Sequence, residues 1–281
     1  MNLNLEPLIA RAAAANGEEP GDYQVKGVLH CGKCRTPKQT AITVMGRDRL
    51  VGCMCRCAQE EYERKRKAQR DTERRLYING LRVNGIQDKS IRDMRFEADD
   101  GNTPEEMDKA RRYVTAWPKM YRENVGLLFW GNTGNGKTFA AACIANALID
   151  QGEPVMVTSF PRILKALNAL YKDDQNAYID SLDQFNLLVI DDLGAERQSS
   201  YALEQVYNVI DRRYKAKKPL IVTTNLPLSS LQKAESMDYQ RVYDRVLELC
   251  IPIAYKGGSR RKKIAAQKME AMQGLFGGDG A

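Results

Sequence analysis

A glycine-rich octapeptide near the middle of the 281-residue chain has the residue types and the spacing of a phosphate-binding loop. Its glycines let the backbone curl so that N–H groups point toward phosphate oxygens. Lys137 adds a positive charge, and the hydroxyl of Thr138 can occupy one position around Mg²⁺. A strand-like run precedes the loop and an alanine-rich helical run follows it, which is the context that this motif requires. We therefore predict a nucleotide site formed by Gly131, Asn132, Thr133, Gly134, Asn135, Gly136, Lys137 and Thr138.

Two carboxylates follow the apolar run Leu187–Ile190. A carboxylate at the carboxyl end of a strand can hold Mg²⁺ opposite Thr138, and we assign this role to Asp191. Asp192 is placed to orient or deprotonate the attacking water. Glu196 is a second candidate for that base, and the choice between them stays open, as does a plain surface position for either.

An asparagine ends another apolar run of the chain. Asn225 follows Leu220–Thr224, and its amide can bond the γ-phosphate or the lytic water. The alternative is a cap or turn, because Leu226 and Pro227 follow and asparagine often caps helices. Because the phosphate loop and the acidic strand end precede it, we favour a role for Asn225 in sensing the phosphate.

Five of the seven cysteines lie between Cys31 and Cys57, and this clustering predicts a zinc site. Cys31 and Cys34 have the two-residue spacing of a zinc knuckle, and zinc prefers four soft ligands in a tetrahedron. A hairpin-like stretch, with strands at Thr40–Val44 and Leu50–Val51, separates the knuckle from the remaining thiols. The favoured ligand set is Cys31, Cys34, Cys55 and Cys57, with Cys53 as the substitute and His30 left out.

Short apolar runs alternate with helix-length segments after residue 124, and this alternation predicts a parallel sheet covered on both faces. The expected strands are Val125–Trp130, Pro154–Thr158, Leu187–Ile190, Leu220–Thr224 and Ile251–Tyr255. The expected helices are Thr138–Gln151, Pro161–Tyr171, Ala202–Lys217 and Tyr239–Leu249. The fold class is therefore α/β, with a five-stranded parallel sheet in one domain.

The segment before this domain has a different character. An alanine-rich helix is expected within residues 5–15, and a charged, exposed helix is expected over Ala58–Leu76, with pairs such as Glu60/Arg64 and Glu61/Lys65. Two Asn-Gly pairs at residues 79–80 and 84–85 indicate a linker. A further helix should begin at Pro104 and run to about Tyr121.

Charge is distributed unevenly along the chain, whose formal net charge is +7. Residues 1–75 carry a net +5 and residues 256–268 a net +6, so that the part between them is mildly acidic. Basic ends suit a polyanion or an acidic protein surface, although a solvated tail is the plain alternative. No apolar run approaches the length of a membrane span, and no signal-like segment opens the chain, so we expect a cytoplasmic protein without a membrane partner.

An ordered set of motifs resembles that of the bacterial replicative-helicase loaders of DnaC type. The set consists of GNTGNGKT, LLVIDDLGAE, IVTTNLP, the Asp244-Arg245 pair and Gly258-Ser-Arg260. Transposition helper ATPases of IstB type are close relatives, and both belong to the AAA+ ATPases. The resemblance covers residues 90–261, and the cysteine-bearing front end is similar to the zinc-containing N-terminal region of some loaders. The resemblance to these loaders implies ATP, Mg²⁺ and Zn²⁺ as cofactors.

The resemblance also implies roles for residues outside the loop. Arg245 matches the arginine finger that reaches the γ-phosphate of a neighbouring subunit, which implies self-association into an ATP-dependent ring or spiral. Arg260 matches the second sensor arginine of the same subunit, and Arg261 is its substitute. The segment Ser159–Lys165, with Tyr171 and Lys172 nearby, matches the part that contacts single-stranded DNA. Only about twenty residues follow Arg260, too few for a full helical lid.

These expectations define four regions and one function. Residues 1–80 are expected to form a helical and zinc-binding region that contacts a hexameric replicative helicase. Residues 81–124 are expected to form a linker and a helix, and residues 125–261 the AAA+ ATPase core. Residues 262–281 are expected to form a basic, glycine-rich tail. The implied function is ATP-dependent delivery of that helicase onto single-stranded DNA, with ATP hydrolysis driving release. The alternatives are an IstB-like ATPase assisting transposition, a P-loop kinase for a small molecule, and a zinc-dependent DNA-binding module, which leaves the phosphate loop unexplained.

Overall fold

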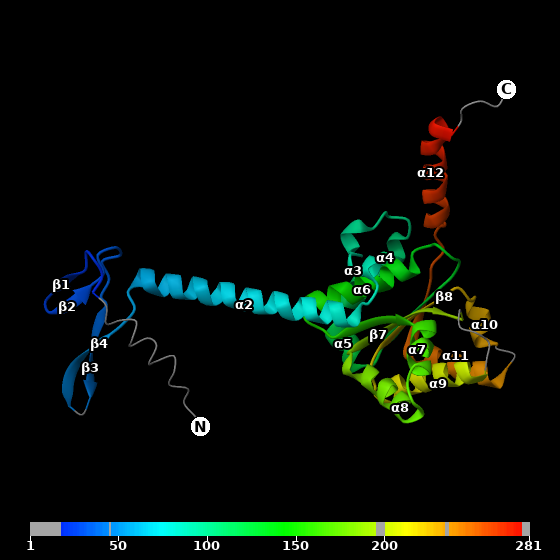
Figure 1. Cartoon of the computed structure of the whole chain (residues 1–281), viewed down its shortest axis with the longest axis horizontal. Coiled ribbons are helices and arrows are strands. Elements are labelled where there is room, and N and C mark those ends of the chain that lie inside the picture. The colour runs from blue at the N-terminus through cyan, green and yellow to red at the C-terminus, as the bar shows by residue number, and fades with distance from the viewer. Residues whose placement is uncertain (1–17, 45, 195–199, 234–235, 277–281) are drawn as a thin grey trace. The chain divides into compact units, whose positions relative to one another are not determined.

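The computed structural model describes residues 18–44, 46–194, 200–233 and 236–276 (Figure 1). The chain divides into two compact units, with the boundary between Leu76 and Tyr77. The helix expected within residues 5–15, Glu196 and the last five residues lie outside the described parts.

The first unit contains two small antiparallel ribbons and the N-terminal part of a long helix, whose last residues belong to the second unit. The first ribbon pairs β1 (Tyr23–Val25) with β2 (Val28–His30), and the second pairs β3 (Gln39–Val44) with β4 (Arg47–Gly52). The second ribbon confirms the expected hairpin. Among the described residues of this unit, the buried ones are Leu29, Cys31, Lys38 and Cys55. So small a core cannot fold this unit by hydrophobic burial alone.

Helix α2 spans Arg56–Gly85 and is longer than the sequence suggested. Its charged, exposed first part was expected, and Lys65 Nζ lies 2.9 Å from a carboxylate oxygen of Glu61. Glu60, however, lies 3.8 Å from Arg56 instead of pairing with Arg64. The expected linker at residues 79–85 is wrong, because the helix continues through both Asn-Gly pairs.

Packing explains this continuation. The last turns of α2 belong to the second unit, and the side chains of Ile78 and Leu81 pack against the buried core of that unit. Gly85 lies so close to strand β6 (Val155–Ser159) that a Cβ atom there would stand 1.9 Å from the carbonyl oxygen of Val155. The missing side chain therefore allows the helix end to approach the sheet, and Ile86 bridges to Val157 immediately afterwards. These contacts outweigh the cost of placing glycine in a helix, which is about 1 kcal/mol per residue relative to alanine.

The second unit is built on a five-stranded parallel sheet, which confirms the predicted fold class. The order is β6 (Val155–Ser159), β7 (Leu187–Leu193), β8 (Leu220–Thr224), β5 (Gly126–Trp130) and β9 (Cys250–Ala254). Strand β8 lies between β5 and β7, so the phosphate-loop strand and the acidic strand are not neighbours. All three strands nevertheless end at the same edge of the sheet, where parallel α/β sheets place their ligand sites.

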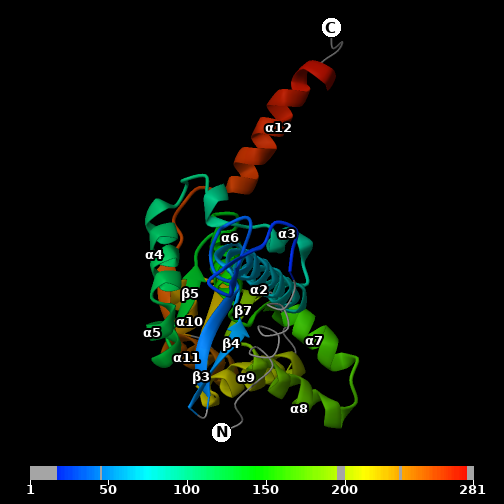
Figure 2. The ribbon, with the colours of Figure 1, turned by 90° about the vertical axis from the view of Figure 1, so that its left-hand side faces the viewer.

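Helices cover both faces of this sheet, as the apolar pattern of the strands requires. One face is packed by α3 (Lys89–Arg92), α4 (Pro104–Thr115), α5 (Trp117–Arg122) and α6 (Lys137–Gln151). The other is packed by α7 (Phe160–Asn168), α8 (Lys172–Ser181), α9 (Ser200–Lys215), α10 (Leu228–Gln232) and α11 (Met237–Leu249). Figure 2 shows α4 and α5 on one side of the sheet and α7 and α8 on the other.

Short elements join these layers. The 3-10 turns η1 (Phe96–Ala98) and η2 (Leu182–Gln184) precede α4 and β7. The single helix expected over residues 104–121 is broken at Ala116, because a second helix starts there with Pro118 in its first turn.

After β9, the described chain forms one further helix, α12 (Arg260–Phe276). In the described parts of the chain, no helix combines the length and the apolar character needed to cross a membrane.

Candidate nucleotide and metal sites

The glycine loop connects β5 to the first residue of α6. Gly131 and Gly136 both have positive φ angles, at which a residue with a side chain would be strained. At Gly136 a Cβ atom would also stand 2.3 Å from the Arg260 guanidinium. The loop thus wraps around the start of α6, where the free N–H groups and the positive end of the helix dipole favour an anion.

Lys137 lies inside this loop and is almost completely buried. Its Nζ donates hydrogen bonds to the carbonyl oxygens of Gly131 and Asn132, both at 2.8 Å, and to Oδ1 of Asn225 at 2.9 Å. Burial lowers the pKa of Lys137, and the carboxylates of Asp192 and Asp191 oppose this shift. A phosphate would offer the ammonium group a charged acceptor in place of neutral ones, which makes a stronger hydrogen bond.

Asp191 faces the first turn of α6. Its Oδ1 accepts hydrogen bonds from the hydroxyls of Thr138 at 2.8 Å and Thr223 at 2.6 Å. Burial raises the pKa of Asp191, and the two hydroxyl bonds act in the opposite direction. A carboxylate and a hydroxyl in contact are hard oxygen ligands, so this pair fits Mg²⁺.

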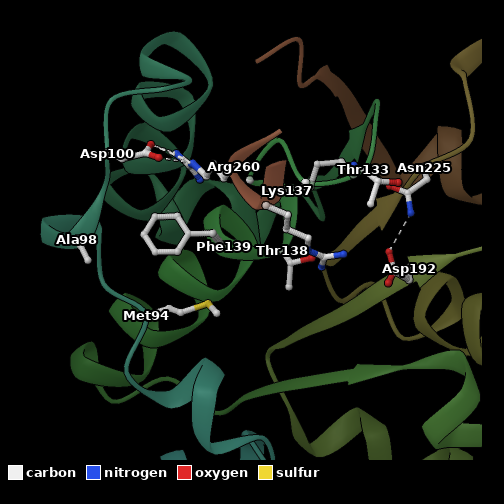
Figure 3. Close-up of a pocket in the computed structure, with 13 residues that line it drawn as sticks. Met94, Ala98, Asp100, Thr133, Lys137, Thr138, Phe139, Asp192, Asn225 and Arg260 are labelled. Atoms are coloured by element: carbon white, nitrogen blue, oxygen red, sulfur yellow. Dashed lines mark hydrogen bonds and ion pairs between the residues drawn. The ribbon is translucent and has the colours of Figure 1, made fainter. Parts of the chain in front are cut away.

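Asn225 lies between the cationic and acidic parts of the site (Figure 3). Its Oδ1 accepts from Lys137, while its Nδ2 donates to Oδ1 of Asp192 at 3.3 Å. The following helix, α10, has Pro227 as its N-cap residue, so the alternative role of Asn225 as a helix cap is not what the structure shows.

Arg260 lies at the other end of the pocket, beside the carboxylate of Asp100 (Figure 3). Its Nε donates to both carboxylate oxygens of Asp100 at 2.9 Å, and its Nη2 lies 3.2 Å from Asp99. Its guanidinium carbon stands 5.3 Å from the centre of the Phe139 ring. The hydrogen bond with Arg260 lowers the pKa of Asp100.

Lys137, Asn225 and Arg260 are among the residues that line a pocket of about 440 Å³, large enough for a nucleotide. Four lining residues, Met94, Ala98, Asp100 and Phe139, were not proposed from the sequence. Phe139 directly follows Thr138 and could have been found from that adjacency. The other three lie in the segment before the sheet, and no motif connects that segment to the loop. The lining comprises Met94, Ala98, Asp100, Thr133, Gly134, Gly136, Lys137, Thr138, Phe139, Asp192, Asn225, Arg260 and Arg261.

Arg245 does not line this pocket. It lies on α11, where its Nη1 is 3.1 Å from Glu248, its Nε is 3.8 Å from Asp211, and its guanidinium lies over the Tyr214 ring at 4.0 Å. The described chain therefore gives Arg245 no contact with its own nucleotide pocket.

The segment expected to contact DNA is only partly available for such a role. Phe160 is fully buried in the core, so its use as a stacking platform is excluded by packing. Tyr171 is 87% exposed, and Lys172 next to it is also exposed. Arg162 lies 3.3 Å from a carboxylate oxygen of Asp88.

Four cysteines of the first unit come together, and they are the favoured set. The sulfur atoms of Cys31, Cys34, Cys55 and Cys57 all lie within 4.8 Å of one another. Sulfur atoms bound at about 2.3 Å around a tetrahedral zinc ion would stand roughly 3.8 Å apart, so these thiols fit the metal. The fifth thiol, Cys53, points to the carbonyl oxygen of Pro37 at 3.6 Å instead.

A hydroxyl group supports one of these thiols. The Thr36 hydroxyl lies 3.1 Å from the sulfur of Cys34 and holds the pKa of that thiol well below its usual range. A lowered pKa favours the thiolate, which is the form that binds zinc.

Comparisons with known proteins agree with this geometry. A family model described as IstB-like ATP binding protein matches residues 41–268. The replicative helicase loader DnaC of Escherichia coli K12 is 28% identical over 167 residues, which cover 58% of this chain and 65% of DnaC. The replicative helicase loader DnaI of Bacillus subtilis 168 is 28% identical over 164 residues, which cover 53% of each chain. The chain thus spans less than two thirds of the length of these relatives.

Solved structures show the same fold. A crystal structure of DnaI superimposes with a TM-score of 0.51 at 23% identity and covers 59% of this chain and 93% of that one. A crystal structure of the DnaC helicase loader gives a TM-score of 0.52 at 23% identity, covering 60% of this chain and 100% of that one.

Proposed function

The chain belongs to the family of IstB-like ATP-binding proteins, and on that premise we propose that it is an ATPase that loads a hexameric replicative helicase onto single-stranded DNA. Its similarity to relatives named as helicase loaders supports the loader role. The observation that carries the proposal is the meeting of Lys137, Asn225 and Asp192 beside the glycine loop.

Each residue of the pocket has a role in this proposal. Lys137 binds the β- and γ-phosphates, and Thr138 and Asp191 hold Mg²⁺, which when bound supplies positive charge to the phosphate oxygens. Asp192 orients or deprotonates the attacking water, with Glu196 as the alternative base. Asn225 bonds the γ-phosphate or that water.

Two arginines complete the proposed site from different subunits. Arg260 is already at the pocket, and a triphosphate would compete with Asp100 and Asp99 for its guanidinium. Arg245 serves a neighbouring subunit, which requires assembly into a ring or spiral. Its absence from its own pocket supports this assignment. A guanidinium suits both roles because it stays charged and its planar fork fits phosphate oxygens.

The first unit and the exposed pair Tyr171 and Lys172 contact the proposed partners. The zinc-bearing unit contacts the helicase, and Tyr171 and Lys172 contact single-stranded DNA by stacking and by charge. Hydrolysis then lowers the affinity of the loader for the helicase. A transposition helper remains the alternative within the family, and a small-molecule kinase would need no arginine from a second subunit.

The test measures helicase transfer with purified components. The replicative helicase that co-purifies with this protein is mixed with ATP and circular single-stranded DNA, and the helicase retained on DNA is quantified. We expect loading by the wild type and none by Lys137→Ala, because the ammonium group contacts the phosphates. Lys119→Ala removes an exposed lysine of α5 and serves as the matched control.

Two results would contradict the proposal. Full loading by Lys137→Ala would show that the pocket is not needed. Co-purification of a transposase in place of a helicase would favour the transposition alternative, and phosphorylation of a small molecule without stimulation by DNA would favour the kinase.

A further inference from the structure

Strand β7 carries an irregularity at the point where its two acids stand. Ile190 pairs with Val222 of β8, but the next pair is Leu193 with Thr224. Asp191 and Asp192 on β7 therefore both lie opposite the single residue Thr223 on β8. Two residues facing one define a β-bulge, and Asp192 has the left-handed φ angle of 57°.

The bulge changes where the two carboxylates point. In a regular strand, consecutive side chains lie on opposite faces of the sheet. Here the carboxylate of Asp191 contacts Thr138, and that of Asp192 contacts Asn225. Asp192 therefore lines the nucleotide pocket, and Asp191, which does not line it, bonds to Thr138, which does.

The hydroxyl of Thr223 bonds to both acids at once. It donates to Oδ1 of Asp191 at 2.6 Å and accepts from the backbone N–H of Asp192 at 3.0 Å. A bulge leaves the N–H of its extra residue without a partner in the ladder, and this hydroxyl takes that place. Thr223 is fully buried, so water cannot easily replace it.

We propose that Thr223 is the positioning residue of the magnesium end of the site, because its one hydroxyl holds both the bulge and the Asp191 carboxylate in place. This inference rests on the proposed ATPase function. Thr138 also donates to Asp191, but its hydroxyl is assigned to Mg²⁺ once a nucleotide binds. Thr223 is then the hydroxyl that continues to orient the carboxylate, as groups behind metal ligands commonly do.

Thr224 provides a control on the same strand. It is equally buried, and its hydroxyl donates to the carbonyl oxygen of Leu193 at 2.7 Å and accepts from the N–H of Leu226 at 3.1 Å. Its bonds go to backbone groups and to neither acid. Thr224→Val therefore removes a buried hydroxyl of the same kind without removing a bond to a proposed metal ligand.

The experiment uses the full chain and a fluorescent ATP analogue that is not hydrolysed. Binding is titrated with Mg²⁺ for the wild type, Thr223→Val, Thr223→Ser and Thr224→Val, and thermal unfolding is recorded for each. We expect Thr223→Val to raise the Mg²⁺ concentration at half-maximal effect by about tenfold or more, the usual cost of losing a group behind a ligand. Binding of the analogue in the presence of EDTA should be unchanged.

The other variants make the inference falsifiable. Thr223→Ser keeps the hydroxyl and should show the wild-type Mg²⁺ dependence. Thr224→Val should lower thermal stability but leave the Mg²⁺ dependence unchanged. The inference is overturned if Thr223→Val keeps the wild-type Mg²⁺ midpoint, or if Thr224→Val shifts the midpoint equally. Failure of the wild type itself to bind the analogue would contradict the proposed function instead.

Discussion

Asn225 is the residue that joins the two oppositely charged parts of the nucleotide pocket. Its amide oxygen takes a bond from Lys137 and its amide nitrogen gives one to Asp192, so both partners fix the orientation of the amide. A phosphate entering the loop would compete for the ammonium group. The amide would then lose its acceptor role toward Lys137, which gives Asn225 a physical means of responding to the nucleotide.

The cysteine cluster yields a prediction at the same scale. We expect Cys55→Ser to remove bound zinc from the protein purified without chelator, because this buried thiol belongs to the group of four. Loss of the metal should also unfold the first unit, whose apolar core is small. Zinc content and the circular dichroism of the full chain measure these effects.

Cys53→Ser is the matched control for this substitution. Cys53 lies two residues away and its sulfur points to a backbone carbonyl, so we expect one zinc ion per chain to remain. Zinc loss in Cys53→Ser with retention in Cys55→Ser would reverse the assignment of ligands, and loss in neither would show that the four thiols do not bind zinc.

At the scale of elements, the end of α2 and strand β6 depend on the absence of a side chain. We expect Gly85→Ala to lower the free energy of unfolding of the second unit by about 1–3 kcal/mol, because the new Cβ atom would overlap the carbonyl oxygen of Val155. Thermal and chemical unfolding of the full chain measure the change.

The same helix provides the opposite case. A Cβ atom at Gly80 would meet no heavy atom within 4 Å, so Gly80→Ala should stabilise the helix by roughly 0.5–1 kcal/mol. Equal effects of the two substitutions would show that α2 does not dock on β6 as the structure has it.

These elements also show what the sequence can reveal. The five strands were predictable because buried parallel strands are continuous apolar runs, and the phosphate loop was predictable because its chemistry lies within eight residues. The docking of α2 was not predictable, because Asn-Gly pairs are typical of turns and the contact of Gly85 with Val155 depends on tertiary structure.

The same distinction holds within the site. Lys137, Thr138 and Asp191 follow from local motifs, whereas Asp100 reaches Arg260 from 160 residues away along the chain. The bulge at Asp191 and Asp192 could not be predicted from the sequence either. It appears only when the register of β7 against β8 is known, since the residue opposite both acids belongs to another strand.

At the scale of the whole molecule, the position of Arg245 bears on assembly. Its guanidinium is held by Glu248 and Asp211 on the surface formed by α11 and α9, and it makes no described contact with the pocket of its own chain. If it acts in hydrolysis, it must do so in the pocket of another protomer, through a head-to-tail contact.

Mixing two inactive variants tests this arrangement directly. Lys137→Ala has a defective pocket but an intact Arg245, whereas Arg245→Ala has an intact pocket but supplies no arginine to its neighbour. We expect each variant alone to lack ATPase activity in the presence of single-stranded DNA. In an equal mixture, about a quarter of the head-to-tail interfaces combine an intact pocket with an intact arginine, so activity should return toward that fraction of the wild-type value.

Lys119→Ala mixed with Arg245→Ala controls for simple dilution of one active protein. An equal mixture of Lys137→Ala and Arg245→Ala that stays inactive, although both variants still assemble in sedimentation measurements, would show that Arg245 does not act across an interface.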